Sequence, residues 1–374
     1  MENHIQIQAT KPELPPYEEY TAEIRDIFET RQMTNNGPKL QKLREMLMKR
    51  IGCENAELFV NGHAALVLAL EALGLPEGGE VLTSPFTFAS TTNAIVQCKL
   101  VPVFCDIDDT YNISVESIRR NITEKTCAIV APHIFGIPCA VRQIAEIAKQ
   151  HDLKVVYDAA QAFGTKIDGA DIGCFGDVTM FSLHAIKVFN SVEGGLLTFR
   201  DSGLKESLEA ARNFGFPPSD KENAVLCGIN AKLDEFRAAM GVVNLPHVDE
   251  NIGKRKRLAA KYADALSRIP GVTTYPYEEH ISYNYAYFPV RIDQDVFGIT
   301  RDELFGKLAE QGIGTRKLYG TLTCDFKSFS ERHYRQDVSY ARELSNKSLD
   351  LPLYSTLTES EIDYIAKAME NARK

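Results

Sequence analysis

Apolar and polar positions alternate along this chain in two periods, which predicts strands and helices in regular succession. Short apolar runs that end at turn residues predict strands at 81–84, 100–106, 127–132, 153–157, 285–292 and 315–319, with another starting at residue 57. Helical spacing predicts helices at 17–30, 39–51, 64–73, 141–150, 202–212, 251–269, 300–311, 340–349 and 359–371, and one within 228–245. Because strands and helices alternate, we expect an α/β protein.

The length of the chain bears on its domain organisation. With 374 residues it is long enough for two domains, and no repeat or low-complexity segment interrupts it. We expect an N-terminal segment at 1–35, a large domain at 36–249 and a smaller α+β domain at 250–374. The boundary is expected in or near the helix that follows Val248.

Composition excludes several classes of protein. The net charge of -9 and the lack of a basic run argue against a nucleic acid partner. No apolar run approaches a membrane span, and the first twenty residues lack the apolar core of a signal peptide. The eight cysteines form no C-x-x-C pair and are interpreted as buried residues of a reducing compartment, so we expect a cytoplasmic protein. No metal site is expected, since none of the eight histidines has a second ligand at a zinc-like spacing.

One stretch, residues 179–199, carries the strongest chemical pattern. It places Ser182 and Lys187 between two apolar runs, the second of which follows a Gly-Gly turn. A lone loop lysine is usually just solvated, but Asp158 follows a predicted strand, where open α/β sheets bind ligands. Pyridoxal phosphate (PLP) needs a lysine to attach its aldehyde and a carboxylate to keep its pyridine nitrogen protonated. Lys187 and Asp158 therefore predict a PLP enzyme.

Two further positions fit that cofactor. Gly62 stands at the junction of a strand and a helix, where backbone amides and the helix N-terminus can receive a phosphate. Phe86 and Phe88 follow the strand at 81–84, and an aromatic ring there either joins the core or covers the cofactor ring. Each signal is weak when taken alone.

Five segments together make a specific pattern. They are Phe59-Val-Asn-Gly-His-Ala-Ala-Leu, Ser84-Pro-Phe-Thr-Phe-Ala-Ser-Thr, Tyr157-Asp-Ala-Ala-Gln-Ala-Phe-Gly, Phe181-Ser-Leu-His-Ala-Ile-Lys and Gly228-Ile-Asn-Ala-Lys-Leu-Asp-Glu-Phe-Arg-Ala-Ala-Met-Gly. In order and spacing the chain resembles the DegT/DnrJ/StrS sugar-nucleotide aminotransferases over nearly its whole length. The resemblance implies PLP fold type I, with a mostly parallel central sheet flanked by helices and a smaller α+β C-terminal domain.

The resemblance also implies a set of cofactor contacts. In it, Phe88 stacks on the ring, Gln161 hydrogen-bonds the ring hydroxyl, and Ser182 binds the phosphate. His63 departs from the pattern, because many relatives carry threonine there, so the hydroxyl contact to the phosphate is lost while the amide contacts remain. The full set is Gly62, His63, Phe88, Asp158, Gln161, Ser182, Lys187 and, from the neighbouring subunit of a homodimer with shared sites, Asn230.

The sequence indicates the substrate-binding residues less clearly than the cofactor-binding residues. An acidic protein that binds a sugar nucleotide must concentrate positive charge locally, and Lys39, Arg212, Arg316 and Lys317 are candidates. The turn at 34–38 lies at the mouth of the active site in the resembled family. The expected substrate-binding residues are Asn36, His184, Arg316 and Tyr319.

The resemblance implies an aminotransferase that converts a nucleotide-linked 4-keto-6-deoxyhexose, most closely dTDP-4-keto-6-deoxyglucose, to the 4-amino sugar. Glutamate is the implied donor, and cell-surface polysaccharide such as the O-antigen of lipopolysaccharide is the implied destination. A 3-keto sugar aminotransferase is one alternative. A PLP-dependent sugar dehydratase is another, although that branch carries histidine where Lys187 stands. A non-catalytic relative would lack Lys187 or Asp158.

Overall fold

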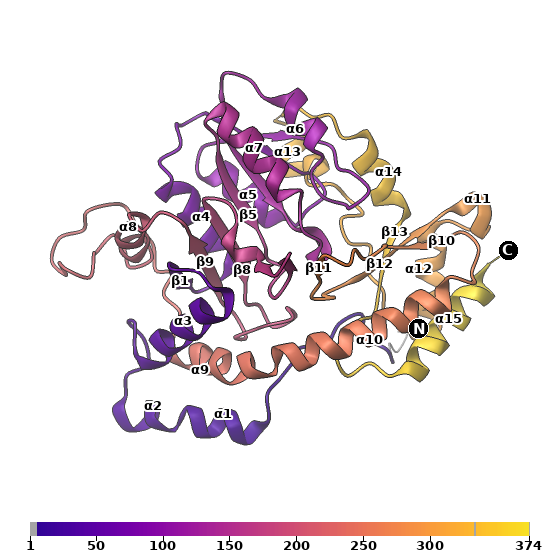
Figure 1. Cartoon of the computed structure of the whole chain (residues 1–374), viewed down its shortest axis with the longest axis horizontal. Coiled ribbons are helices and arrows are strands. Elements are labelled where there is room, and N and C mark those ends of the chain that lie inside the picture. Colours follow the sequence, from indigo (N-terminus) through magenta and orange to yellow (C-terminus); the bar gives the residue numbers. More distant parts are fainter. Residues whose placement is uncertain (1–5, 333, 374) are drawn as a thin grey trace.

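The computed structural model describes residues 6–332 and 334–373, and a seven-stranded sheet lies at its centre (Figure 1). Neighbouring strands from β8 to β3 pair in parallel, whereas β9 runs antiparallel to both β8 and β1. The prediction of a mostly parallel sheet is confirmed. In spatial order the strands are β1 (Ala56–Phe59), β9 (Gly195–Phe199), β8 (Val178–Ser182), β5 (Lys154–Asp158), β4 (Thr126–Pro132), β2 (Glu80–Thr83) and β3 (Val101–Phe104).

Both faces of this sheet are covered, because alternate strand residues enter two different apolar clusters. Val155 and Phe181 join one cluster, and their neighbours Val156 and Met180 join the other. Covering both faces explains why the strands are continuous apolar runs. The first face packs against α3 (Pro38–Ile51), α6 (Val115–Asn121), α7 (Val141–His151) and α9 (Glu235–Asn244), and the second against α4 (Gly62–Ala72), α5 (Ala89–Gln97) and α8 (Leu204–Ala211).

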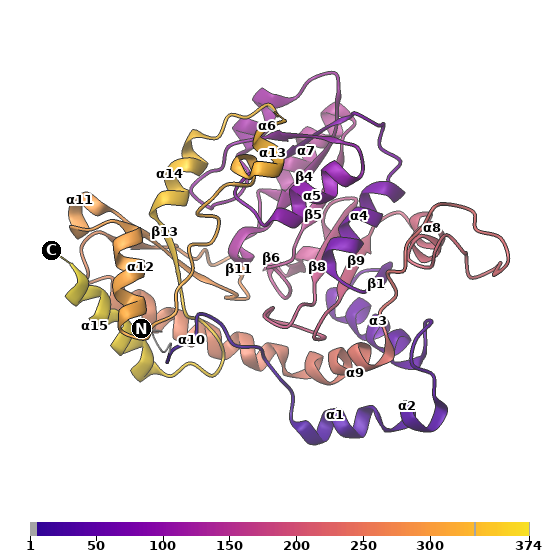
Figure 2. The same cartoon turned by 180° about the vertical axis from the view of Figure 1, so that it is seen from behind.

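A smaller α+β unit has its own core around an antiparallel sheet, β10-β12-β13. The long helix α10 leads into it from α9 (Figures 1 and 2). Ile7 joins the same core and pairs with Ile313, so this part of the N-terminal segment packs on the smaller unit. The elements that follow α9 are α10 (Val248–Leu266), β10 (Val272–Thr274), β12 (Phe288–Ile292), α11 (Gln294–Phe297), α12 (Arg301–Glu310), α13 (Lys327–Ser330), α14 (Ser339–Lys347), β13 (Ser348–Leu351) and α15 (Glu359–Ala372).

Two secondary-structure predictions were wrong. The expected helix at 17–30 is divided at Ile24, which keeps helical dihedral angles, so the two halves stay nearly in line (Figure 1). The expected strand at 315–319 is absent, because only Arg316 pairs, with Asp350, and Tyr319 adopts a positive φ of 58° that breaks extended structure. The divided helix comprises α1 (Tyr17–Glu23) and α2 (Arg25–Thr30), and the elements that were not predicted include the short strands β6 (Lys166–Ile167), β7 (Ala170–Asp171) and β11 (Ile281–Ser282).

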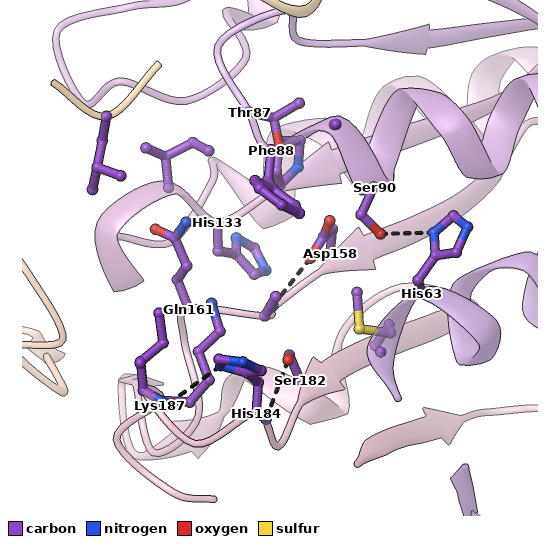
Figure 3. A pocket seen from close by; sticks show the side chains of 18 of the residues that line it. His63, Thr87, Phe88, Ser90, His133, Asp158, Gln161, Ser182, His184 and Lys187 are labelled. Carbon is purple, nitrogen blue, oxygen red and sulfur yellow. Dashed lines mark hydrogen bonds between the residues drawn. The ribbon is translucent and has the colours of Figure 1, made fainter. Parts of the chain in front are cut away.

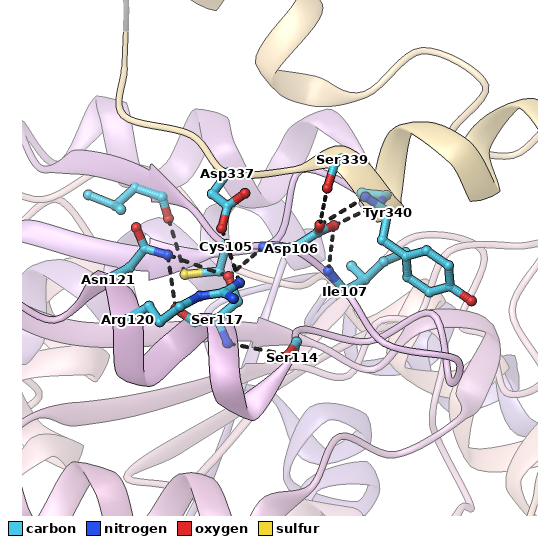
Figure 4. Close-up of polar contacts among 12 residues, drawn as sticks. Cys105, Asp106, Ile107, Ser114, Ser117, Arg120, Asn121, Asp337, Ser339 and Tyr340 are labelled. Carbon is cyan, nitrogen blue, oxygen red and sulfur yellow. Dashed lines mark hydrogen bonds and ion pairs between the residues drawn. The ribbon is translucent and has the colours of Figure 1, made fainter.

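Residues 335–341, which we call the strap, attach a late part of the chain to the large sheet. Phe104 of the edge strand β3 donates its amide to the Arg335 carbonyl at 2.9 Å and accepts from the Asp337 amide at 3.2 Å. Asp106 then caps α14 by accepting from the amides of Tyr340 (2.9 Å) and Ala341 (2.7 Å) (Figure 4). The strap therefore belongs to the large sheet by contact, although in sequence it lies between elements of the smaller unit, after α12 and before β13.

The cysteines correct one expectation. All eight are free thiols, but only Cys105, Cys139 and Cys324 are buried, while Cys174 and Cys227 are exposed and the other three are half-buried. Cys174 ends the 3₁₀ turn Ile172–Cys174, and Cys227 lies in the loop that projects beyond α8 (Figure 1). Across residues 6–332 and 334–373, no helix has both the length and the apolar character that crossing a membrane requires.

Candidate active site

A pocket of about 540 Å³ opens at the carboxyl ends of the parallel strands, the usual ligand position of open α/β sheets. Its walls come from segments that follow β1, β2, β4, β5 and β8. The structure brings together ten of the residues predicted from sequence: Gly62, His63, Phe88, Asp158, Gln161, Ser182, His184, Lys187, Arg316 and Tyr319. Asn36 and Asn230 lie outside it within this chain.

Asp158, at the end of β5, is buried at the floor of the pocket. Its carboxylate accepts from the Thr91 hydroxyl at 2.7 Å and from the Ala160 amide at 3.1 Å. Burial raises the pKa of Asp158, while the hydrogen bond from Thr91 opposes that rise. Because an unpaired buried carboxylate is costly, the site suits a cationic group placed against it, such as a protonated pyridine nitrogen.

Lys187 lies on the loop between the antiparallel pair β8 and β9, and its side chain lines the same pocket (Figure 3). The Lys187 amide donates to the His184 carbonyl at 2.9 Å, which fixes the backbone of the turn. Lys187 Nζ makes no hydrogen bond or ion pair with the part of the chain that the structure describes. Its amine is therefore available to an aldehyde in the pocket.

The N-terminus of α4 forms an anion cradle at one end of the pocket. Asn61 caps the helix by accepting from the Ala64 amide at 2.8 Å. A side chain on Gly62 would come within 3.1 Å of Met180 Sδ and 3.2 Å of Ser182 Cβ, so glycine leaves room for close approach here. The helix dipole, the free amides and the Ser182 hydroxyl together suit a phosphate.

His63 follows Gly62, and both of its ring nitrogens lie within hydrogen-bonding distance of other side chains. Its Nδ1 lies 2.9 Å from the Ser90 hydroxyl and its Nε2 lies 3.2 Å from Gln97 Oε1 (Figure 3). Ser90 lines the pocket and thus brings a hydroxyl from α5 beside the position where sequence comparison expected one. Ser90 was missed as a site residue, although it stands in the quoted motif that begins at Ser84.

Two ring-bearing residues define the upper wall. Phe88 is 69% exposed and borders the pocket, so its face is open to a planar ligand. His133 was not predicted; it is buried, stacks on Tyr157 at 4.7 Å and accepts from the Cys139 amide at 2.9 Å. Burial lowers the pKa of His133 to about 3, so it stays neutral. His133 therefore serves as fixed packing rather than as a charged group.

Gln161 follows β5 and connects it by hydrogen bonds to Phe135 and to Tyr319, which stands on another wall of the pocket. Its Oε1 accepts from the Phe135 amide at 2.6 Å, and its Nε2 donates to the Tyr319 hydroxyl. Phe135 has a positive φ of 59°, which turns its amide toward Gln161. The pair joins residues 158 positions apart in sequence, which no local pattern could predict.

Arg316 stands on the same wall as Tyr319. Its Nε and Nη2 both donate to Asp350 Oδ2, at 3.0 and 2.7 Å, and its guanidinium lies 5.0 Å from the centre of the Tyr287 ring. Asp350 is buried and also accepts from the Phe288 amide at 3.0 Å. Arg316 is therefore held rigidly with part of its guanidinium facing the pocket.

The other basic candidates are paired inside the chain. Lys39 bonds Glu23 at 3.0 Å, Arg212 bonds Glu57 at 3.0 Å and Lys317 bonds Asp302 at 3.2 Å. Arg212 borders a second pocket of about 500 Å³, whose lining includes Asn36, Lys221 and Lys232. Asn230 is exposed and pairs with Asn213.

The residues present fit PLP. One end of the pocket offers a phosphate cradle, the floor offers a buried carboxylate that needs a cation, and Lys187 offers an unpaired amine. Among the described residues, no group of three or more His, Cys, Asp or Glu side chains is arranged to hold a metal.

Comparison with known proteins gives the same result. The chain is 38% identical to the dTDP-4-amino-4,6-dideoxy-D-glucose transaminase of Shigella dysenteriae, over 98% of this chain and 99% of that one. It is 35% identical to the Escherichia coli protein of the same name, over 98% and 99%. The solved structure of DesI, determined in the presence of its TDP-sugar product, superposes with a TM-score of 0.92 at 30% identity, over 98% and 92%. Residues 17–370 match the DegT/DnrJ/EryC1/StrS aminotransferase family, and the chain belongs to it as a PLP-dependent aminotransferase.

Proposed function

We propose that this enzyme transfers an amino group from L-glutamate to C4 of dTDP-4-keto-6-deoxyglucose and so forms dTDP-4-amino-4,6-dideoxyglucose. The observation that carries this proposal is the 38% identity, along nearly the whole of both chains, to the Shigella relative of that name. His63, the departure from the resembled pattern, lines the pocket. It concerns the phosphate wall rather than the chemistry of transfer.

The residues divide the reaction between them. Bound PLP supplies an electron-poor ring that stabilises negative charge next to the transferred nitrogen. Lys187 Nζ holds the cofactor and then, once free, takes the proton from the donor carbon. Asp158 holds the ring nitrogen protonated, and Phe88 covers the ring face. The floor of the pocket excludes water because Asp158 and Thr91 are both buried.

We also propose a homodimer in which Asn230 of one chain completes the site of the other. The loop that follows α8 projects from the body of the molecule (Figures 1 and 2). This loop exposes apolar side chains that a lone chain would leave in water, namely Phe214, Val225 and Ile229. A second copy would bury them and bring Asn230 to a new pocket.

We place the enzyme in the cytoplasm and its product in the synthesis of cell-surface polysaccharide such as the O-antigen. The free thiols, two of them exposed, support a reducing compartment. An amino sugar on a nucleotide carrier is an activated donor, which a glycosyltransferase then consumes.

A substrate panel tests the proposed reaction. Purified enzyme with PLP and L-glutamate is offered the 4-keto and 3-keto isomers of the dTDP-linked sugar and the UDP- and GDP-linked 4-keto sugars, and products are located by mass and NMR. We expect nitrogen on C4 of the dTDP-linked sugar. Nitrogen on C3, or preference for another nucleotide, would contradict the proposed substrate and leave the aminotransferase assignment standing. Loss of the hydroxyl without gain of nitrogen would indicate a dehydratase.

A further inference from the structure

The turn that follows Lys187 is buried, although the lysine itself is only half-buried. Residues 188–191, which we call the lysine turn, are each 0–4% exposed. In the proposed function Lys187 first holds the cofactor and then carries a proton, so its side chain must move while its backbone keeps one position. The contacts that fix the lysine turn therefore decide where the amine can reach.

Asn190 makes two long-range polar contacts from the lysine turn. Its Nδ2 donates to the main-chain carbonyl of Glu13 at 2.8 Å, and its own carbonyl accepts from Asn244 Nδ2 at 3.0 Å. These partners lie 177 and 54 positions away in the sequence, one before α1 and the other at the end of α9. The lysine turn is therefore clamped between the N-terminal segment and the helix that leads into α10.

The backbone next to Asn190 has an unusual conformation. Val192 has a positive φ of 68°, which is rare for a β-branched residue. Its amide donates to Asn190 Oδ1 at 3.3 Å, so the side chain that contacts Glu13 also holds this conformation. Strained residues persist only where their surroundings hold them, and they gather at functional sites. Without the Asn190 side chain we expect the lysine turn to relax.

Glu13 is itself held by the smaller unit. Its carboxylate accepts from Arg255 Nη2 of α10 at 2.7 Å and from the Ser355 amide at 3.0 Å. Glu13 is 8% exposed and Arg255 is 1% exposed, and a buried ion pair adds little net stability because desolvation offsets its attraction. The pair instead fixes one position for the N-terminal segment, which runs beside α10 from the smaller unit towards α1 (Figures 1 and 2).

We propose that Asn190 is a positioning residue for Lys187, and that Glu13 connects it to the smaller unit. The contacts form one path, from Ser355 through Glu13 to Asn190 and the lysine turn. Asn190 does not line the pocket, so it acts through the backbone that carries Lys187. This rests on the proposed function only in taking Lys187 as the residue that holds the cofactor.

The test compares Asn190→Ala with Asn121→Ala. Asn121 is a matched control, because it is also buried and its Nδ2 also donates to a carbonyl, that of Ser117 at 2.9 Å, on a helix away from the pocket. Both variants lose one buried amide, so thermal melts should show similar losses of stability. A third variant, Glu13→Gln, keeps the carbonyl that Asn190 contacts but removes the ion pair with Arg255.

Three measurements separate positioning from stability. Hydrogen exchange of amides 183–194 is followed in the full chain before PLP is added. Borohydride treatment of the PLP-loaded protein gives the fraction of cofactor that becomes fixed to Lys187. Steady-state amination gives kcat and the KM of the keto sugar nucleotide.

We expect Asn190→Ala to speed exchange in residues 183–194 by about tenfold, as when one hydrogen bond's local stability is lost. It should lower kcat by about a hundredfold, the cost of misplacing a reacting group by about 1 Å, and change the KM of the sugar nucleotide little. The fixed fraction of cofactor should fall. Glu13→Gln should move the same quantities in the same direction by a smaller factor, and Asn121→Ala should move none of them.

An unchanged kcat in folded Asn190→Ala would overturn the proposal, and so would a loss of kcat that Asn121→Ala matches. If Asn190→Ala does not fold, exchange in the unaltered chain decides: a lysine turn that exchanges as fast as the loop following α8 would contradict a fixed position. Failure of borohydride to fix any cofactor to Lys187 in unaltered enzyme would contradict the proposed function instead, whatever the exchange rates.

Discussion

Asp158 and Asn230 represent two regions of this molecule that are built in opposite ways. Asp158 is 6% exposed, and hydrogen bonds from Thr91 and Ala160 fix its carboxylate. Asn230 is exposed at the base of the loop that follows α8, where it pairs with Asn213 and lies beside the exposed apolar residue Ile229. The chain's own packing thus completes the ring end of the site before any ligand arrives. Asn230, by contrast, is exposed, and under the proposed dimer it contacts a cofactor only in the pocket of a second chain.

This contrast separates chemistry that the residues of one chain can carry out from binding that needs a residue of a second chain. If the contrast is right, substitutions at the catalytic residues of the pocket abolish the activity of that pocket whichever chain it pairs with. A substitution of Asn230 is instead complemented by a second chain that still carries Asn230.

The largest effect is expected from Lys187→Ala. Without the amine, both the covalent hold on the cofactor and the proton carrier are lost, so turnover should fall by many orders of magnitude, within the roughly 10⁶-fold or greater accelerations of enzymes. Steady-state amination, measured with a thermal melt to show that the fold survives, checks this. Lys149→Ala, on the exposed last turn of α7, is the matched control and should stay active. Near-normal turnover of Lys187→Ala would refute the assignment.

Asp158→Asn should have the next largest effect. An amide still accepts from Thr91 but cannot balance a protonated ring nitrogen, so the proton-transfer step should slow by about a hundredfold or more, as when one preorganised electrostatic contact is removed. Single-turnover kinetics on reconstituted enzyme measure it separately from cofactor retention. Asp152→Asn, at an exposed left-handed position that asparagine tolerates, is the control. An unchanged half-reaction rate would mean that another group partners the ring.

A mixing experiment tests the shared site. Lys187→Ala and Asn230→Ala chains, inactive or weak alone, are mixed and allowed to exchange. Random pairing makes half of the dimers hybrid, each with one intact site of two, so activity should return to about a quarter of the unaltered level. Failure to recover any activity, despite hybrids seen by native mass spectrometry, would show that Asn230 serves its own chain.

The smallest effect is expected at the strap. Asp106→Asn weakens the cap of α14, which should lower the free energy of unfolding by about 1 kcal/mol and leave kcat nearly unchanged. Asp337→Asn removes an exposed ion pair with Arg120 at 3.0 Å and serves as control, with a smaller loss. Chemical denaturation of both variants checks the order. A large loss of kcat in Asp106→Asn would mean that the strap positions the pocket as well as the helix.

The strands of the central sheet could be predicted from sequence, because a strand that is covered on both faces is a continuous apolar run. Val155 and Val156 face opposite clusters, and a run that is apolar on both sides can be recognised without its partners. The strand expected at 315–319 failed because its end depends on Tyr319, whose positive φ goes with a contact to Gln161 far away in the chain. Local apolar spacing carries no information about such a contact.

The candidate site divides in the same way. Lys187 and Asp158 follow strands of the same sheet, so topology alone predicts that they meet. Thr91, which bonds Asp158, comes from α5, and nothing in its local sequence marks it as a partner of residue 158. The pairing of Arg212 with Glu57 was equally hidden, because each residue taken alone has the sequence features of a surface charge.

The strap has a consequence for the order in which the protein can be made. Strand β3 is an edge of the seven-stranded sheet, and the backbone groups of Phe104 on its outer side stay unpaired until residues 335–337 leave the ribosome. An unpaired edge is a template for association with other chains. Nascent or truncated chains that end before the strap should therefore be the aggregation-prone forms of this protein, and refolding yield should depend on the last tenth of its sequence.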